Sequence, residues 1–251
     1  MTQQTRIIST LTLIVIMSST MLLLTHRTAH AISELQLYIE HGTYTQKDNP
    51  ADPESWLTSL GSFKLWVIGN VGAKGTIYDV QLAVAHAATE TGTITLTPTK
   101  ATAGLLPSTG DNSTPIAPLY RASGSGTAPI DGNGKSLPPH DIYGPGTAWE
   151  TYSLGNLSLT DSPIGDFITA FPTSFPELGQ INVYDVAVTG YSWVHFDAFD
   201  HYLSKNGAKY VNAPFSHDAG STPVPEPATL LLLGGGLAGL ALFGRRRAKR
   251  Q

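Results

Sequence analysis

The sequence contains no cysteine, and only 14% of its 251 residues are charged. The absence of cysteine excludes a disulfide-stapled fold, thiol catalysis, zinc–thiolate sites and iron–sulfur clusters. Few charges, together with 25 glycines and 17 prolines, argue against a coiled coil or a protein built of long helices. The net charge of -4 leaves no basic footprint for nucleic acid, so we expect no nucleic-acid partner.

Residues 1–31 have the features of a secretory signal peptide. Arg6 supplies a positive charge, residues 7–24 form an apolar stretch, and Ala29 and Ala31 form an A-x-A cleavage pattern. The alternative is an uncleaved N-terminal membrane helix, because this apolar stretch is long for a signal peptide. In both cases we expect the following residues to be exported across the inner membrane.

The C-terminal residues predict a second membrane segment. Pro225, Glu226 and Pro227 precede an apolar run over residues 228–243, and a cluster of four arginines and one lysine follows that run. Sixteen helical residues span about 24 Å, slightly less than a hydrocarbon core of about 30 Å, so the run predicts a marginal transmembrane helix. The basic cluster would remain cytoplasmic. We therefore expect residues 220–251 to form a linker and a membrane tail.

The Pro-Glu-Pro triplet, the Leu/Gly-rich run and the terminal arginine cluster resemble the PEP-CTERM sorting signal. This resemblance implies a Gram-negative bacterium that makes extracellular polysaccharide. It also implies that an exosortase, an integral-membrane processing enzyme, recognises Pro225, Glu226 and Pro227. The protein would then be anchored in the membrane at least transiently and afterwards reach the cell surface or the extracellular space. Extracellular polysaccharide is a further candidate partner.

The exported part is acidic and rich in strand signals. Residues 32–222 contain 8 Lys or Arg and 18 Asp or Glu, a net charge of -10 (8 − 18). Alternating and β-branched segments predict strands at 34–40, 63–68, 77–87, 93–97, 150–154, 157–159 and 181–197. Residues 164–170 are expected to form one or two helical turns. Many short strands with Gly and Pro turns predict an all-β domain over residues 32–219, an antiparallel β-sandwich or jelly roll.

Residues 100–147 differ from the rest of this domain because they contain seven prolines and several glycines. We expect them to form a long excursion between strands of one sandwich, and the alternative is that they separate two subdomains. The segments around residues 77–84 and 183–188 have a similar pattern of apolar residues with one Asp between them. This similarity predicts two comparable core strands, one in each sheet.

Histidine and aspartate gather near the end of the domain, at His195, Asp197, Asp200, His217 and Asp218. In a strand, His195 and Asp197 would point to the same face, because side chains repeat every two residues. Aspartate oxygens with backbone carbonyls suit Ca²⁺, whereas imidazole favours zinc or another transition metal. We therefore hypothesise a structural metal site formed by these five residues, with Ca²⁺ as the first candidate. The alternative is that the His–Asp pairs only hydrogen-bond and hold the C-terminal strand.

Several segments of the domain also resemble the choice-of-anchor N proteins. The residues that carry this resemblance are Tyr38, Thr43, Tyr44, 54–56, 63–69, 194–197 and 214–218. The resemblance spans residues 34–219 and implies a self-contained exported domain whose anchor is a separate module. It implies no catalytic residues.

Enzyme motifs are absent from the sequence: it has no nucleophile elbow, phosphate-binding glycine loop or dinucleotide fingerprint. We therefore expect a non-enzymatic domain with a structural or adhesive role in the extracellular matrix or cell envelope. One alternative is a carbohydrate-binding module that presents Trp56, Trp66, Trp149 or Trp193, although a core position is expected for each. Glycan hydrolysis is a third hypothesis, because carboxylate pairs such as Asp52/Glu54 and Asp197/Asp200 occur.

Overall fold

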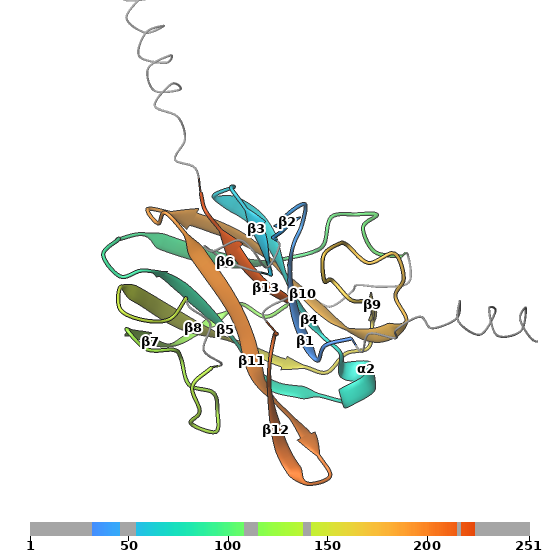
Figure 1. Cartoon of the computed structure of the whole chain (residues 1–251). Coiled ribbons are helices and arrows are strands. Elements are labelled where there is room, and N and C mark those ends of the chain that lie inside the picture. The colour runs from blue at the N-terminus through green and yellow to red at the C-terminus, as the bar shows by residue number, and fades with distance from the viewer. Residues whose placement is uncertain (1–31, 46–53, 108–114, 138–141, 215–216, 224–251) are drawn as a thin grey trace, which may run out of the picture. The chain divides into compact units, whose positions relative to one another are not determined.

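The structure is a computed structural model, and it describes residues 32–45, 54–107, 115–137, 142–214 and 217–223 (Figure 1). The signal-peptide prediction with Ala29 and Ala31, the triplet of residues 225–227, and Asp52 lie outside these described residues. Within them, no helix has both the length and the apolar character needed to span a membrane.

The described residues form two sheets, and the smaller one contains five antiparallel strands. Four of them lie in the order β1 (Leu35–Ile39), β4 (Ser62–Gly69), β10 (Glu177–Thr189) and β6 (Thr93–Thr99). The fifth, β9 (Ser162–Ile164), pairs with the beginning of β10. The short helix α2 (Val71–Lys74) follows β4 and is capped by the side chain of Asn70.

The larger sheet contains eight strands. Seven lie in the order β2 (Thr43–Tyr44), β3 (Ser55–Thr58), β13 (Asp218–Ser221), β11 (Val194–Ser204), β5 (Ile77–Ala87), β8 (Thr147–Leu157) and β7 (Leu119–Ser125). The eighth, β12 (Gly207–Asn212), forms a hairpin with the end of β11. Neighbouring strands of the larger sheet are antiparallel, except that β13 and β3 are parallel. The last strand of the described residues, β13, therefore lies inside the sheet, paired on both sides.

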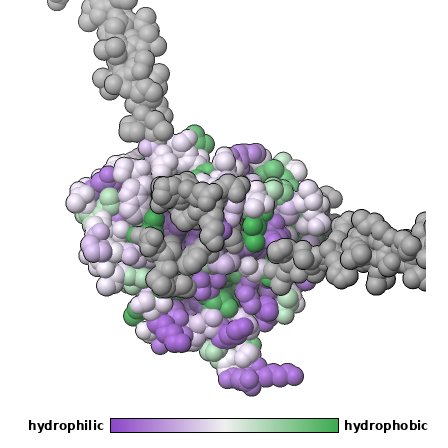
Figure 2. Space-filling view, in the orientation of Figure 1, coloured by the Kyte–Doolittle hydropathy of each residue, from purple (hydrophilic) through white to green (hydrophobic). Residues whose placement is uncertain are grey.

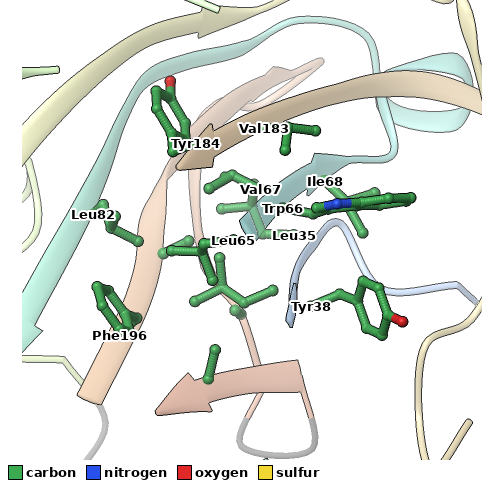
Figure 3. Close-up of a cluster of buried hydrophobic side chains, with 14 of the residues drawn as sticks. Leu35, Tyr38, Leu65, Trp66, Val67, Ile68, Leu82, Val183, Tyr184 and Phe196 are labelled. Carbon is green, nitrogen blue, oxygen red and sulfur yellow. The ribbon is translucent and has the colours of Figure 1, made fainter. Parts of the chain in front are cut away.

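The two sheets share one hydrophobic core (Figure 3). Leu65 and Val67 of β4 contribute to it from the smaller sheet, and Leu82 of β5 and Phe196 of β11 contribute from the larger one. Burial of these apolar side chains is the main force that holds the sheets together. The prediction of an all-β domain with mainly antiparallel strands is confirmed.

Most predicted strands lie where the alternation placed them, and β5 has the predicted bounds. The segment 181–197 is instead two strands, because Gly190 (φ 79°) turns the chain between β10 and β11. The segment 150–154 lies within β8, which ends at Leu157, so only the first residue of the segment predicted at 157–159 is in a strand. Gly155 (φ 77°) lies at a register shift within β8. The helical turns predicted at 164–170 are wrong, because the chain after β9 is irregular.

The similar segments around 77–84 and 183–188 belong to β5 and β10, one in each sheet as predicted. Within residues 100–147, Leu119–Ser125 form β7, which pairs with β8 at the edge of the larger sheet. The Gly/Pro-rich composition gave no signal for this strand. The described residues between β7 and β8, 126–137 and 142–146, are here called the covering segment.

Each sheet also has side chains buried on its outer face, where they alternate with the residues that lie between the sheets. On the smaller sheet these outer side chains are continuous with the hydrophobic cluster described above. On the smaller sheet, Tyr38 and Trp66 pack edge to face, with ring centroids 5.3 Å apart, and both contact Phe167 and Phe171 from the irregular residues after β9. On the larger sheet, Phe199 and Ala83 form a second small hydrophobic cluster with Leu137 of the covering segment. Loop segments thus bury one outer region of each sheet.

Candidate functional site

The candidate site lies on the outer face of the larger sheet. Along β11, Val194, Phe196 and Ala198 belong to the shared core. His195 and Asp197 alternate with them and therefore face outward. On the neighbouring strand β13, Gly220 is paired with His195, so the antiparallel register brings Asp218 beside Asp197 on the same face.

Small residues leave space for these polar side chains. Ala85 of β5 is the register partner of His195, and Ala83 is the partner of Asp197. The three polar side chains are nearly removed from solvent, with exposed fractions of 1% for His195, 7% for Asp197 and 1% for Asp218. We call His195, Asp197 and Asp218 the His–Asp cluster.

The members of the His–Asp cluster converge on a common point. His195 Nε2 lies 3.4 Å from Asp197 Oδ2 and 3.8 Å from Asp218 Oδ2. One potential ligand atom from each residue lies within 4.8 Å of those of the other two, a spacing that could hold a metal ion. Both nitrogen–oxygen distances exceed the range of about 2.7–3.2 Å that is usual for an N–H···O hydrogen bond.

Tyr143 of the covering segment reaches the cluster from above the sheet. Its hydroxyl donates a short hydrogen bond to Asp197 Oδ2. Burial, and then the charge of Asp197, raise the pKa of Tyr143 well above its usual value. The phenol therefore keeps its proton and acts as the donor, which fixes the orientation of the Asp197 carboxylate.

Asp200 has its partners elsewhere, although it is on the same strand and is also buried. It lies at the register shift between Phe199 and His201, where its backbone has φ 154°. Its Oδ2 accepts a hydrogen bond of 3.2 Å from Gln81, and its Oδ1 lies 2.7 Å from Nδ1 of His201. Burial raises the pKa of Asp200.

His217 also faces a different partner. Its Nε2 lies 3.4 Å from Asp166 Oδ1, and neither ring nitrogen makes a hydrogen bond to the described residues. Burial lowers the pKa of His217 to about 4, so the ring is neutral near pH 7. Of the five candidate ligands named from the sequence, the structure thus brings together His195, Asp197 and Asp218, and pairs the other two with different residues.

Two residues with buried polar contacts were not identified from the sequence. Tyr143 lies in the covering segment, where no periodicity indicates which side chain faces the sheet. The other is Glu40, which is buried on the opposite side of the fold and accepts hydrogen bonds from Trp66 Nε1 (2.9 Å), Thr102 N (2.9 Å) and Thr102 Oγ1 (2.6 Å). Glu40 shows how a buried carboxylate of this protein is satisfied by hydrogen bonds alone.

The chain beyond β13 carries a separate functional signal. Residues 223–247 match the PEP-CTERM protein-sorting motif. The match includes residues 225–227, so the predicted sorting signal is confirmed. The motif implies recognition by exosortase and export toward the envelope of a Gram-negative bacterium.

No curated protein matches the chain. The resemblance to the choice-of-anchor N proteins therefore stays a prediction.

Proposed function

We propose that this chain is an exosortase-sorted surface or matrix protein whose two-sheet domain has a structural or adhesive, non-enzymatic role. The observation that carries the proposal is the direct junction between domain and sorting motif. Strand β13 ends at Ser221, and the motif begins at residue 223. Because β13 is hydrogen-bonded to β3 on one side and to β11 on the other, a load applied through the tail is shared by two ladders. This arrangement suits a domain held at a surface.

The surface of the domain supports this proposal. On the face shown in Figure 2, hydrophobic residues form separate small spots among hydrophilic ones. The exposed large hydrophobic residues of the described chain are distributed over several elements: Leu60, Ile116, Leu119, Tyr120, Ile130, Leu159, Leu178 and Leu203. With the acidic charge of residues 32–222, this pattern suits a domain that remains dispersed in water and attracts cations.

The burial of the His–Asp cluster supports a structural rather than a catalytic role. A polymeric substrate has to reach the reacting groups, yet each of the three side chains is at most 7% exposed. A catalytic acid or base also has to come within hydrogen-bonding distance of its substrate. The carboxylate pair Asp197/Asp200 is unsuited to glycan hydrolysis for a further reason, since Asp200 is engaged by Gln81 and His201.

Carbohydrate binding is a second candidate, favoured by an aromatic group at the edge of the larger sheet. Tyr120 of β7 is 53% exposed, and its ring meets that of Tyr152 of β8 edge to face, with centroids 6.1 Å apart. The hydroxyl of Tyr152 donates a short hydrogen bond to Glu150. Sugar binding needs an exposed aromatic ring beside polar groups, and this group supplies both. Trp56 and Trp66 are buried, whereas Trp149 and Trp193 are partly exposed.

The proposal is tested in a polysaccharide-producing host that has an exosortase. We expect the wild-type chain to be recovered with the surface or matrix fraction, and a P225A/E226A variant to remain in the membrane fraction. Retention in the matrix without release of reducing sugar from host polysaccharide supports the structural or adhesive role. Release of reducing ends by the purified full-length chain would overturn the non-enzymatic part.

The carbohydrate-binding candidate has its own matched pair of variants. Tyr120→Ala removes the exposed ring, and Leu119→Ala removes its similarly exposed neighbour on the same strand. Loss of polysaccharide binding by the first variant alone would favour the binding module. Equal polysaccharide binding by both variants and the wild type would show that Tyr120 does not contact the sugar.

A further inference from the structure

We propose that His195, Asp197 and Asp218 bind one divalent transition-metal ion of the Zn²⁺ class beneath the covering segment. The proposal concerns what holds the outer face of the larger sheet together. It does not depend on the surface or matrix role proposed above.

The distances within the cluster are the first argument. Hydrogen bonds in this protein bring Glu40 to 2.6–2.9 Å from its three donors. The imidazole of His195 instead lies 3.4 and 3.8 Å from the two carboxylate oxygens. Atoms that share a tetrahedral ion at bonds of about 2.0–2.1 Å are about 3.3 Å apart. The separation of 3.4 Å matches this value, and the whole group, which lies within 4.8 Å, would contract slightly around the ion.

Charge is the second argument. Asp197 and Asp218 are both buried, and one carboxylate oxygen of each lies within 4.8 Å of the other. Two ionised carboxylates at such a short distance repel each other, and burial makes both charges less favourable. Protonated His195 contributes at most one positive charge, whereas a divalent ion balances both carboxylates.

The donor set selects the class of ion. Ca²⁺ takes six to eight ligands and prefers oxygen, while the described cluster contains an imidazole nitrogen and two carboxylates. Nitrogen and carboxylate donors are usual for Zn²⁺, which is bound by three protein ligands in many sites and completes its coordination with water. We therefore place the Zn²⁺ class ahead of the Ca²⁺ that the sequence suggested.

Tyr143 supports the proposed site as an orienting group. Ligand carboxylates in metal sites are commonly hydrogen-bonded by a second residue that fixes their direction. The Tyr143 hydroxyl does this for Asp197, and Tyr143 also packs against the small cluster of Ala83, Leu137 and Phe199. The ion would thus connect β11 and β13, and Tyr143 would couple the covering segment to it.

The test uses the full-length chain in mild detergent, stripped with a chelator and titrated with Zn²⁺, Co²⁺ or Ca²⁺. Zn²⁺ should bind at one ion per chain, measured by elemental analysis after dialysis. Zn²⁺ at 100 times its dissociation constant should raise the unfolding midpoint by about 5–11 °C. Bound Co²⁺ should give the visible absorption bands of a four- or five-coordinate site. Ca²⁺ should give no saturable shift.

Two substitutions test whether the ion is bound at the His–Asp cluster. Asp218→Asn should abolish the Zn²⁺-dependent shift, while Asp200→Asn should retain it. The second variant is a matched control, because it also removes a buried carboxylate from the larger sheet but leaves the three proposed ligands in place. If Asp218→Asn does not fold, the stoichiometry and the Co²⁺ spectrum of the wild type still test whether the chain binds one ion of this class.

Three results would overturn the proposal. The first is the absence of saturable Zn²⁺ or Co²⁺ binding by the wild type. The second is a Zn²⁺ shift that survives in Asp218→Asn, which would place the ion elsewhere. The third is a saturable shift with Ca²⁺ and none with Zn²⁺, which would reject the proposed class of ion.

Discussion

The two sheets bury their outer faces by different means. The smaller sheet is covered by aromatic packing around Tyr38 and Trp66, and its buried carboxylate, Glu40, is satisfied by three hydrogen bonds. The larger sheet is covered by a segment that encloses the His–Asp cluster, where the nitrogen–oxygen distances are longer than hydrogen bonds. The first cover satisfies its carboxylate with hydrogen bonds, while the second brings together three potential ligand atoms at a spacing that suits an ion.

This contrast shows that burial alone does not say how a polar group is stabilised. A buried carboxylate needs hydrogen bonds, an opposite charge or an ion, since an uncompensated one destabilises the fold. Glu40 uses the first of these solutions. The protein therefore contains an internal reference against which the His–Asp cluster can be compared.

The largest effect is expected from the aromatic cover. Trp66→Ala removes a fully buried ring that contacts Tyr38, Phe167 and Phe171, and it should lower the free energy of unfolding by about 3–5 kcal/mol. Urea unfolding, followed by far-UV circular dichroism, measures this loss. The half-buried Trp193 is the control, and Trp193→Ala should cost clearly less. Equal losses would mean that Trp66 gains nothing from the aromatic cover beyond what half-buried Trp193 contributes.

The next effect concerns the satisfied carboxylate. Glu40→Ala leaves the Trp66 indole N–H and the Thr102 backbone N–H without their acceptor, which should lower the unfolding free energy by about 2–4 kcal/mol. Glu40→Gln retains an acceptor oxygen and should lose less. Chelator should not change either loss, because no ion is expected at this face. If the loss in unfolding free energy changed with chelator, the two covers would not differ in their dependence on an ion.

The covering segment should contribute less than the shared core. Leu137→Ala should lower the unfolding free energy by about 2 kcal/mol, at the low end for leucine, because a loop can collapse into the space. Leu65→Ala makes the same change between the sheets and should cost about 4 kcal/mol, because the strands there cannot close the cavity. Equal values would show that the covering segment is packed as firmly as the core.

The sequence predicted the shared core well, because period-two alternation records which face of a strand is buried. Leu82 and Val84 of β5 are examples, and the predicted bounds of this strand agree with the structure. Alternation carries no information about the covered outer faces, since their partners come from irregular segments. Trp66 is buried on such a face, as expected for a tryptophan in a strand, but the pattern does not show that Phe167 and Phe171 cover it.

The candidate site was predicted only in part for a similar reason. The spacing of His195 and Asp197 places both on one face, which the structure shows. Strand pairing decides the rest: the register of β13 on β11 brings in Asp218, and the register shift at Asp200 directs that residue to other partners. Neither the pairing of two distant strands nor the position of Tyr143 can be derived from local pattern.

The smallest effect is expected at the surface, where charge pairs are solvated. Lys64 Nζ lies 3.0 Å from Asp185 Oδ1, and the side chain of Asp185 is 55% exposed. Asp185→Asn should change the unfolding free energy by no more than about 0.5 kcal/mol at moderate salt, since water already screens the pair. Unfolding of the wild type and the variant at increasing salt concentration measures the contribution of this ion pair to stability. A loss as large as that of Glu40→Ala would mean that exposure does not separate weak from strong carboxylate contacts in this fold, and the comparison of the two covers would lose its basis.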